Sequence, residues 1–264
     1  MRKIIISLLG SIFLSVCMLS STVLAENTIN VPILAYHNLD PSATGEMTLS
    51  TARFEEQLKW LKDNGYTVIP LQDLVSYLQG KIDSLPEKSV VITADDGRKS
   101  VYTYMWPLVR KYNVPVTLFI YPTAISNAPY AMTWEQLREL QQTGLFDIQG
   151  HTYWHPNFKQ EKKRLSDSEY QKLVYAQFVS AKKVLDKKLN TNITLLAWPY
   201  GIYDDYLERE AARSGYVAAF SIDARPANRS ESMMSQPRYM IVAGQSMQTF
   251  AAIASGKYGA KKKH

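Results

Sequence analysis

The stretch SVVITADDG, residues 89–97, decides how the rest of the chain is interpreted. Its VVIT run is apolar and β-branched, which is typical of a buried strand. The run leads into two adjacent carboxylates, Asp95 and Asp96, which are followed by Gly97. Neighbouring carboxylates repel each other, so this placement favours a bound cation or a shared proton. An ordinary Asp-Asp-Gly turn is the alternative, because both residue types are common in turns.

Short apolar strands alternate with helical segments along most of the chain. This alternation predicts a parallel sheet, and seven or eight such units in 264 residues predict an α/β fold, a distorted (β/α)7–8 barrel. We expect the segments 121–132 and 157–168 to be loops that shape a cleft. The predicted strands are 31–36, 67–69, the strand that ends at 95–96, 116–121, 146–149, 193–198, 217–220 and 239–242, and the predicted helices are 51–64, 71–79, 101–112, 134–142, 167–189, 204–214 and 247–254.

Chemically capable side chains fall at the ends of several different predicted strands. In parallel barrels the working groups gather at the carboxyl ends of the strands. We therefore expect these side chains to converge on one site, which scattered turn residues would not do. They are His37, Asp95, Asp96, His151, Trp198 and Tyr200.

Three histidines precede the C-terminal tail, at positions 37, 151 and 155. His151 and His155 lie between Gly150 and Pro156, so we expect them on a loop or one irregular turn. Two imidazoles and a carboxylate from the Asp-Asp pair would form a site for zinc or a similar divalent ion, with positions open for water and substrate. Ordinary hydrogen-bonded histidines are the alternative, since a His-x-x-x-His pair alone is a weak signal.

Two motifs resemble those of a known family. The TADDG segment ending at Gly97 resembles the Thr-Phe-Asp-Asp-Gly motif of the polysaccharide deacetylases, the carbohydrate esterase family 4 with its NodB-homology domain. The segment HTYWHP, which begins at His151, matches their His-Ser/Thr-x-x-His-Pro motif. The resemblance covers Val31 to Val242 and implies a distorted (β/α)7–8 barrel of the NodB-homology type. Ala94 replaces the family's Phe, and we expect this to change packing behind the acids.

The resemblance also implies roles for the residues of these motifs. Asp95 resembles the family's general base, and Asp96, His151 and His155 resemble its metal ligands. The implied cofactor is a divalent metal ion, with zinc expected and cobalt or nickel as alternatives.

A third motif is matched by Ala197-Trp-Pro-Tyr-Gly201. By this resemblance the backbone N–H of Tyr200 would help to hold the oxyanion, beside Pro199 and Trp198. The arginine that usually precedes the proline, and that orients the base, is missing. Arg238 is our candidate for that base-orienting residue.

The general-acid histidine also departs from the common pattern. Most family members carry it near the C-terminus, whereas this chain has only the tail residue His264 after His155. The segment ILAYH, which ends at His37, resembles the permuted arrangement of the exported poly-N-acetylglucosamine deacetylases. We therefore assign His37 as general acid, with Asp40 or Asp223 as a guess for the carboxylate that tunes it.

Residues 1–25 read as a secretory signal peptide, and residues 26–264 as one polysaccharide deacetylase domain. Arg2 and Lys3 precede an apolar run, and Val23-Leu24-Ala25 presents small residues to a signal peptidase. An uncleaved membrane anchor is the competing interpretation, weakened by five serines in the run. A lipoprotein cysteine at Cys17 is disfavoured because Val16 precedes it.

Cleavage after Ala25 would leave a mature chain without cysteine, which excludes disulfides and thiol catalysis. The mature chain would hold 28 basic and 24 acidic residues, a net charge of +4, part of it in the terminal Lys-Lys-Lys-His. We read no nucleic-acid site in this pattern. We expect a monomer, secreted or in the cell envelope, that touches a membrane only through an uncleaved signal segment.

The resemblance, together with the N-terminal segment, implies an exported, metal-dependent N-deacetylase of a β-linked polysaccharide that contains N-acetylglucosamine, in a biofilm or a cell wall. A metal amidohydrolase of the same fold acting on a non-sugar amide is the first alternative. A carbohydrate-binding protein that has lost catalysis is the second. A glycosidase is disfavoured, because adjacent aspartates cannot easily straddle a glycosidic bond. The aromatics expected to stack on sugars, where they do not pack, are Trp154, Trp198, Tyr153 and Tyr203.

Overall fold

The computed structural model describes residues 29–42 and 45–259. The predicted signal peptide and the lysine-rich tail lie outside these residues, as does the alternative of an N-terminal anchor. Within the described ranges, no helix is long and apolar enough to cross a membrane.

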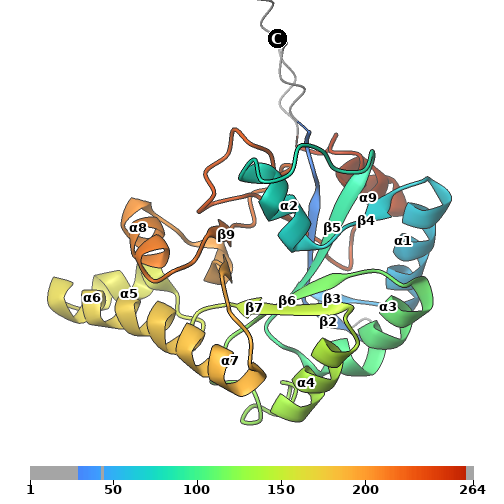
Figure 1. Ribbon diagram of the computed structural model, residues 1–264. Coiled ribbons are helices and arrows are strands. Elements are labelled where there is room, and N and C mark those ends of the chain that lie inside the picture. Colours follow the sequence, from blue (N-terminus) through green and yellow to red (C-terminus); the bar gives the residue numbers. More distant parts are fainter. Residues whose placement is uncertain (1–28, 43–44, 260–264) are drawn as a thin grey trace, which may run out of the picture.

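The strands form one curled, parallel sheet that helices surround (Figure 1). Their order is β10–β1–β5–β6–β7–β8–β9, and β4 pairs with the first part of β5. A parallel bridge between Phe220 and Gln236 joins the end of β9 to the segment that leads into β10, so the sheet nearly closes. The predicted distorted barrel is confirmed. The strands are β1 (Ile33–Tyr36), β4 (Thr67–Val68), β5 (Ser89–Asp95), β6 (Val116–Ile120), β7 (Phe146–Gly150), β8 (Leu195–Ala197), β9 (Ala218–Phe220) and β10 (Tyr239–Met240).

Alternating side chains along the strands separate two hydrophobic cores. In β5, Val90 packs in the outer core, between the sheet and the surrounding helices. Val91 belongs to the inner core, which also holds Phe119 of β6 and the apolar face of α2 (Leu71–Leu78). Asp95 lies an even number of residues after Val91 on the same strand. The strand period therefore turns the Asp95 carboxylate toward the barrel interior.

Most helices begin and end close to where their sequence signals predict. At the start of α1 (Thr51–Asp63), the Ser50 hydroxyl accepts a hydrogen bond from the Arg53 N–H. A capping box of Thr133 and Gln136 starts α4 (Trp134–Gln142). The other helices of this kind are α2, α8 (Asp205–Arg213) and α9 (Met247–Ala254).

Two predicted helices contain π-helical turns. In the segment 101–112, a π turn, η1 (Val101–Met105), precedes α3 (Trp106–Tyr112), and Pro107 lies in the first turn of α3. Ser100, Met105 and Trp106 are helical as well, so Pro107 lies inside a continuous helical segment directly after the π turn. A proline lacks the N–H of a regular α-helical turn, which fits its place at this irregularity. The predicted helix 167–189 is divided into α6 (Asp167–Tyr175), a π turn η2 (Ala176–Ser180) and α7 (Ala181–Leu189).

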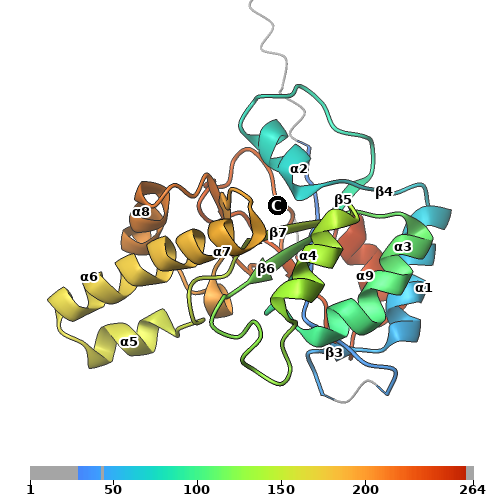
Figure 2. The ribbon, with the colours of Figure 1, turned by 60° about the horizontal axis from the view of Figure 1, so that its bottom comes forward.

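Three elements were not predicted. The segment expected as a loop at 157–168 contains α5 (Phe158–Arg164), which buries only Phe158 and so lacks a helical hydrophobic pattern. Figure 2 shows α5 beside α6. The other two form a short parallel pair, β2 (Asn38–Leu39), which directly follows His37, and β3 (Thr48–Leu49). These strands are too short for a period to be visible in the sequence.

Gly97 provides a test of how tightly the Asp-Asp-Gly turn is packed. Its φ is +64°, and a Cβ there would lie 2.8 Å from Ile125 Cδ1 and 3.0 Å from Ile120 Cγ2. Gly144 has a similar φ of +72° with nothing within 4 Å, so it is a matched control. We expect Gly97→Ala to lower the free energy of unfolding by about 1–3 kcal/mol more than Gly144→Ala. Urea unfolding of both variants measures this, and equal losses would contradict it.

Candidate active site

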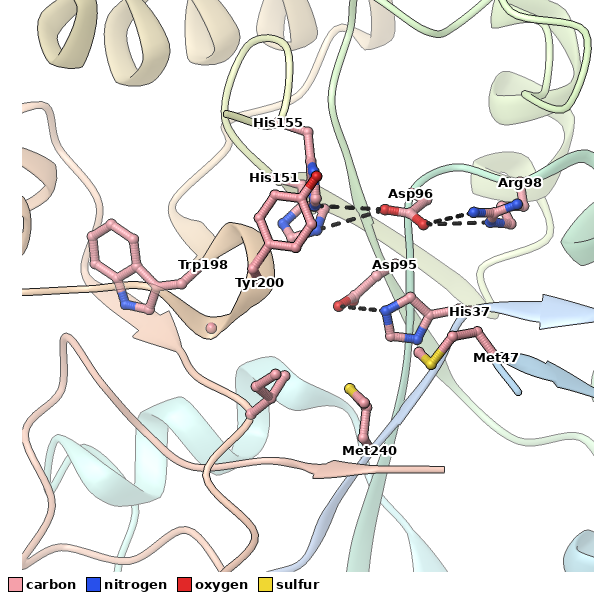
Figure 3. A pocket seen from close by; sticks show the side chains of 12 residues that line it. His37, Met47, Asp95, Asp96, Arg98, His151, His155, Trp198, Tyr200 and Met240 are labelled. Carbon is pink, nitrogen blue, oxygen red and sulfur yellow. Dashed lines mark hydrogen bonds and ion pairs between the residues drawn. The ribbon is translucent and has the colours of Figure 1, made fainter. Parts of the chain in front are cut away.

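The predicted site residues meet at the carboxyl ends of the strands. A cavity of about 330 Å³ opens there (Figure 3). Arg238 lies buried behind Asp95, and Pro199 is buried in the short 3-10 turn η3 (Pro199–Gly201). The side chains that line the cavity are His37, Met47, Asp95, Asp96, Arg98, His151, His155, Trp198, Tyr200, Gly201, Ile222 and Met240.

A buried ion pair joins Asp95 to Arg238. The two guanidinium nitrogens Nη1 and Nη2 each donate to one Asp95 oxygen at 2.8 Å, and both side chains are at most 2% exposed. Arg238 also donates to the Thr93 hydroxyl and to the Ser221 carbonyl, both at 3.1 Å. Burial alone raises the pKa of Asp95, but the Arg238 charge and its hydrogen bonds outweigh burial and hold that pKa well below its usual range. Asp95 is therefore ionised at neutral pH.

Asp96, His151 and His155 form a group that can hold a metal ion. The Nε2 atoms of His151 and His155 each lie 3.8 Å from Asp96 Oδ1. These separations are too long for hydrogen bonds and suit donors that face one centre. The Nδ1–H of His151 donates to the Ala197 carbonyl at 2.7 Å, which leaves the Nε2 lone pair facing the group. The donor set and its orientation thus fit a divalent ion.

His155 is in the form that a metal requires. Burial, together with the neighbouring His151, lowers the pKa of His155 to about 4. Its imidazole is therefore neutral near neutral pH, and only the neutral ring has a lone pair for coordination.

Left-handed backbone conformations gather around the cavity. Asp96, Thr152, His155 and Tyr200 have φ values of +71°, +65°, +63° and +57°. Such conformations cost non-glycine residues of order 1–3 kcal/mol each and persist only where the surroundings enforce them. The sequence did not predict these left-handed conformations, because glycine is the residue that usually marks them and none of the four residues is a glycine.

His37 lies on the other side of Asp95 from the metal-ligand group. Its Nε2 is 4.0 Å from Asp95 Oδ2, while its buried Nδ1 has no hydrogen-bond partner among residues 29–42 and 45–259. Burial lowers the pKa of His37 below its ordinary value, partly offset by the Asp95 carboxylate. The prediction that Asp40 or Asp223 tunes His37 is wrong, because the carboxylates that raise the pKa of His37 are those of Asp95 and Asp96. Asp40 accepts from the Ser42 N–H, and Asp223 accepts from the hydroxyls of Ser221 and Tyr203.

A family model described as polysaccharide deacetylase matches residues 83–219 of this chain. The matched stretch is just over half of the chain and contains the Asp-Asp-Gly turn, both metal-site histidines and Tyr200. The chain belongs to the polysaccharide deacetylase family. It is accordingly a hydrolase of amide bonds. His37 and Arg238 lie outside the matched stretch, one on each side of it.

Known members resemble this deacetylase over most of its length. It is 29% identical to YxkH of Bacillus subtilis, a protein assigned provisionally to the polysaccharide deacetylases, over 88% of this chain and 79% of that one. It is 26% identical to the poly-β-1,6-N-acetyl-D-glucosamine N-deacetylase of Escherichia coli K12 over 83% of this chain but only 37% of that protein.

Two solved structures of deacetylases are also similar to this chain. The Streptococcus pyogenes deacetylase PplD, solved in complex with acetate, superposes with a TM-score of 0.76 at 26% identity, over 86% of this chain and 99% of that one. IcaB from Ammonifex degensii, at 23% identity and a TM-score of 0.75 over 86% and 97%, supports the fold.

The prediction that four aromatic residues could stack on sugars is corrected in part by their burial in the deacetylase. Trp198 is only 1% exposed, and its indole N–H donates to the Met234 carbonyl at 2.8 Å, so it forms cavity wall and cannot be an open stacking surface. Tyr203 packs against Trp198. Trp154 and Tyr200 are exposed, and the Tyr200 ring meets His155 edge-on.

Sequence reasoning missed four residues of the cavity. Arg98 donates through Nε and Nη2 to Asp96 Oδ2, both at 3.3 Å, so only Oδ1 of Asp96 faces the two histidines. Its position directly after the Asp-Asp-Gly turn was a usable signal. Figure 3 shows Met47 and Met240 near His37 and away from His155. No sequence pattern marks these two residues or Ile222 as cavity residues.

Removing Arg238 should destabilise the deacetylase strongly. Arg238→Met leaves the buried Asp95 carboxylate without its cation, and we expect a loss of about 3–5 kcal/mol in the free energy of unfolding at pH 7. Arg225→Met, which breaks the more exposed pair with Glu231, is the matched control and should cost at most about 1 kcal/mol. Urea unfolding compares them, and equal costs would refute the prediction.

The same pair predicts how stability depends on pH. The folded-state pKa of Asp95 lies below its unfolded-state value, so the pair's contribution is fully present above the unfolded-state pKa of 3.8. It is lost as the pH falls through the folded-state pKa. Arg238→Met should accordingly show a weaker loss of stability in acid than the wild type.

Proposed function

We propose that this chain is an exported, metal-dependent N-deacetylase that acts on N-acetylglucosamine units of a β-linked polysaccharide. The observation that carries the proposal is the placement of Asp95 between a three-residue metal group and His37 at one cavity. The names of relatives such as the E. coli enzyme support the choice of polymer.

In this proposal Asp96, His151 and His155 hold the metal, with zinc expected and cobalt or nickel as alternatives. Such an ion, when bound, supplies a Lewis acid that polarises the acetamide carbonyl and lowers the pKa of water. Arg98 holds the second oxygen of Asp96 and so limits it to one donor atom.

Asp95 and His37 divide the proton transfers between them. Asp95, kept ionised by Arg238, accepts the proton of the attacking water as general base. His37 gives a proton to the leaving amine as the C–N bond breaks, which releases acetate and a glucosamine unit. The backbone N–H of Tyr200, in the turn that Pro199 begins and next to Trp198, stabilises the oxyanion.

The placement of the chain in the cell belongs to the same proposal. Residues 1–25 direct export and are removed, and residues 26–264 act as one domain. The product of this processing is a secreted or cell-envelope monomer, which contacts a membrane only where the signal segment stays uncut.

Acetate release from β-1,6- and β-1,4-linked N-acetylglucosamine oligomers tests the reaction. We expect activity in the mature chain that is lost on metal removal and returns with zinc or cobalt. Asp95→Asn and His37→Asn should each reduce kcat by about a hundredfold or more. Asp40→Asn is the control and should leave kcat unchanged, since the Asp40 carboxylate accepts from the nearby Ser42 N–H and Asp40 is not among the residues that line the cavity.

The way in which the acetate-release assay fails would distinguish the alternative functions from one another. Metal binding through His151 and His155 without acetate release from any oligomer would favour an amidohydrolase of non-sugar amides or a carbohydrate-binding protein. Activity that is indifferent to metal removal would contradict the proposal altogether.

Trp154 is the exposed aromatic nearest in sequence to a metal-group residue, and it offers a stacking surface for a sugar ring. The side chain is 41% exposed and directly precedes His155. We expect Trp154→Ala to raise KM for oligomers about 2- to 10-fold with little change in kcat, which corresponds to about 0.5–1.5 kcal/mol of stacking. Tyr175→Ala, an exposed aromatic on α6, should leave KM unchanged. An unchanged KM in Trp154→Ala would exclude a stacking role.

A further inference from the structure

The loop between His151 and His155 holds a conformation that it cannot favour by itself. Thr152 and His155 both have left-handed backbones, at φ +65° and +63°. Each costs of order 1–3 kcal/mol for a residue with a side chain. Something outside the loop must therefore hold it in place.

Gln177 supplies that support. Its Oε1 accepts hydrogen bonds from the backbone N–H groups of Tyr153 and Trp154, both at 3.1 Å. The next N–H, that of His155, donates to the Thr152 hydroxyl at 3.2 Å. Three consecutive N–H groups thus converge on two oxygens, and the Gln177 oxygen is the one that comes from outside the loop.

The position of Gln177 is itself rigid. It is only 1% exposed and lies in the π turn η2, between α6 and α7. The adjacent Phe178 is also fully buried and packs its ring against Phe158, Trp198 and Tyr216. π turns inside α-helices are frequently found at functional sites. In this turn Gln177 and Phe178 are both buried. Phe178 packs in the core, and Gln177 binds the loop between His151 and His155.

We infer that Gln177 is a positioning residue of the metal site, which orients His155 toward Asp96 and His151 by holding the two intervening N–H groups. The inference rests on the metal site of the proposed function and adds to it a residue 22 positions further along the chain than His155. Without the acceptor, two N–H groups lose their partner, and the strained loop relaxes away from the geometry that faces the histidines.

The affinity for Zn²⁺, measured in competition with a chelator on the full chain, tests this without reference to activity. We expect Gln177→Leu to weaken Zn²⁺ binding by about 10- to 100-fold. Gln177→Asn, which withdraws the amide by one methylene, should weaken it as well. Gln177→Glu keeps an acceptor oxygen and should stay within a few-fold of the wild type. Gln171→Leu, on the exposed face of α6, is the matched control and should bind as the wild type does.

The absorption spectrum of bound Co²⁺ separates positioning from general stabilisation. A Gln177 that only stabilised the fold would give variants of lower melting temperature with an unchanged spectrum and Zn²⁺ affinity, and that result overturns the inference. An altered spectrum in Gln177→Asn supports it even if Gln177→Leu does not fold. Equal Zn²⁺ binding by the wild type and His155→Ala would instead refute the metal site, and with it the proposed function.

Discussion

The buried pair of Asp95 and Arg238 is the interaction on which the arrangement of the cavity depends. A carboxylate that is 2% exposed cannot stay ionised without a cation, and Arg238 supplies one through two parallel hydrogen bonds at 2.8 Å. The same guanidinium also binds Thr93 of β5 and the Ser221 carbonyl after β9. The Arg238 side chain therefore connects β5 to the end of β9, where the curled sheet nearly closes.

Residues with left-handed backbone conformations are concentrated around the cavity that contains this pair. Eight non-glycine residues among the described residues have positive φ, and four of them, Asp96, Thr152, His155 and Tyr200, lie at or beside the cavity. Asn113 and Asn190, by contrast, are ordinary left-handed helix caps. Buried hydrogen bonds to other segments, such as the one that His151 Nδ1–H donates to the Ala197 carbonyl, keep cavity residues in their positions.

The two flanks of the chain add residues to a cavity whose other residues lie mostly in the stretch that matches the family model. The stretch that matches the family model carries Asp95, Asp96, His151 and His155, whereas His37 on the β1 side and Arg238 before β10 come from outside it. Both flanking strands pair in the sheet next to each other, with β1 between β10 and β5. Because β1 lies between β10 and β5, the sheet order brings both His37 and Arg238 to Asp95, although Arg238 is 143 residues from it.

Local signals in the sequence determined much of this protein. The short apolar runs that alternate with helical segments were enough to predict a parallel barrel. The chemically capable residues at the ends of these runs, together with the motifs, were enough to predict the group of Asp95, Asp96, His151, His155 and His37 at its carboxyl end, because strand ends in such a barrel share one edge. Packing decided the rest. The burial of Trp198, the unpartnered Nδ1 of His37, the hold of Arg98 on Asp96 and the reach of Gln177 into the histidine loop all depend on which side chains meet across the fold. Such meetings join segments far apart in the chain, and no local period or spacing encodes them.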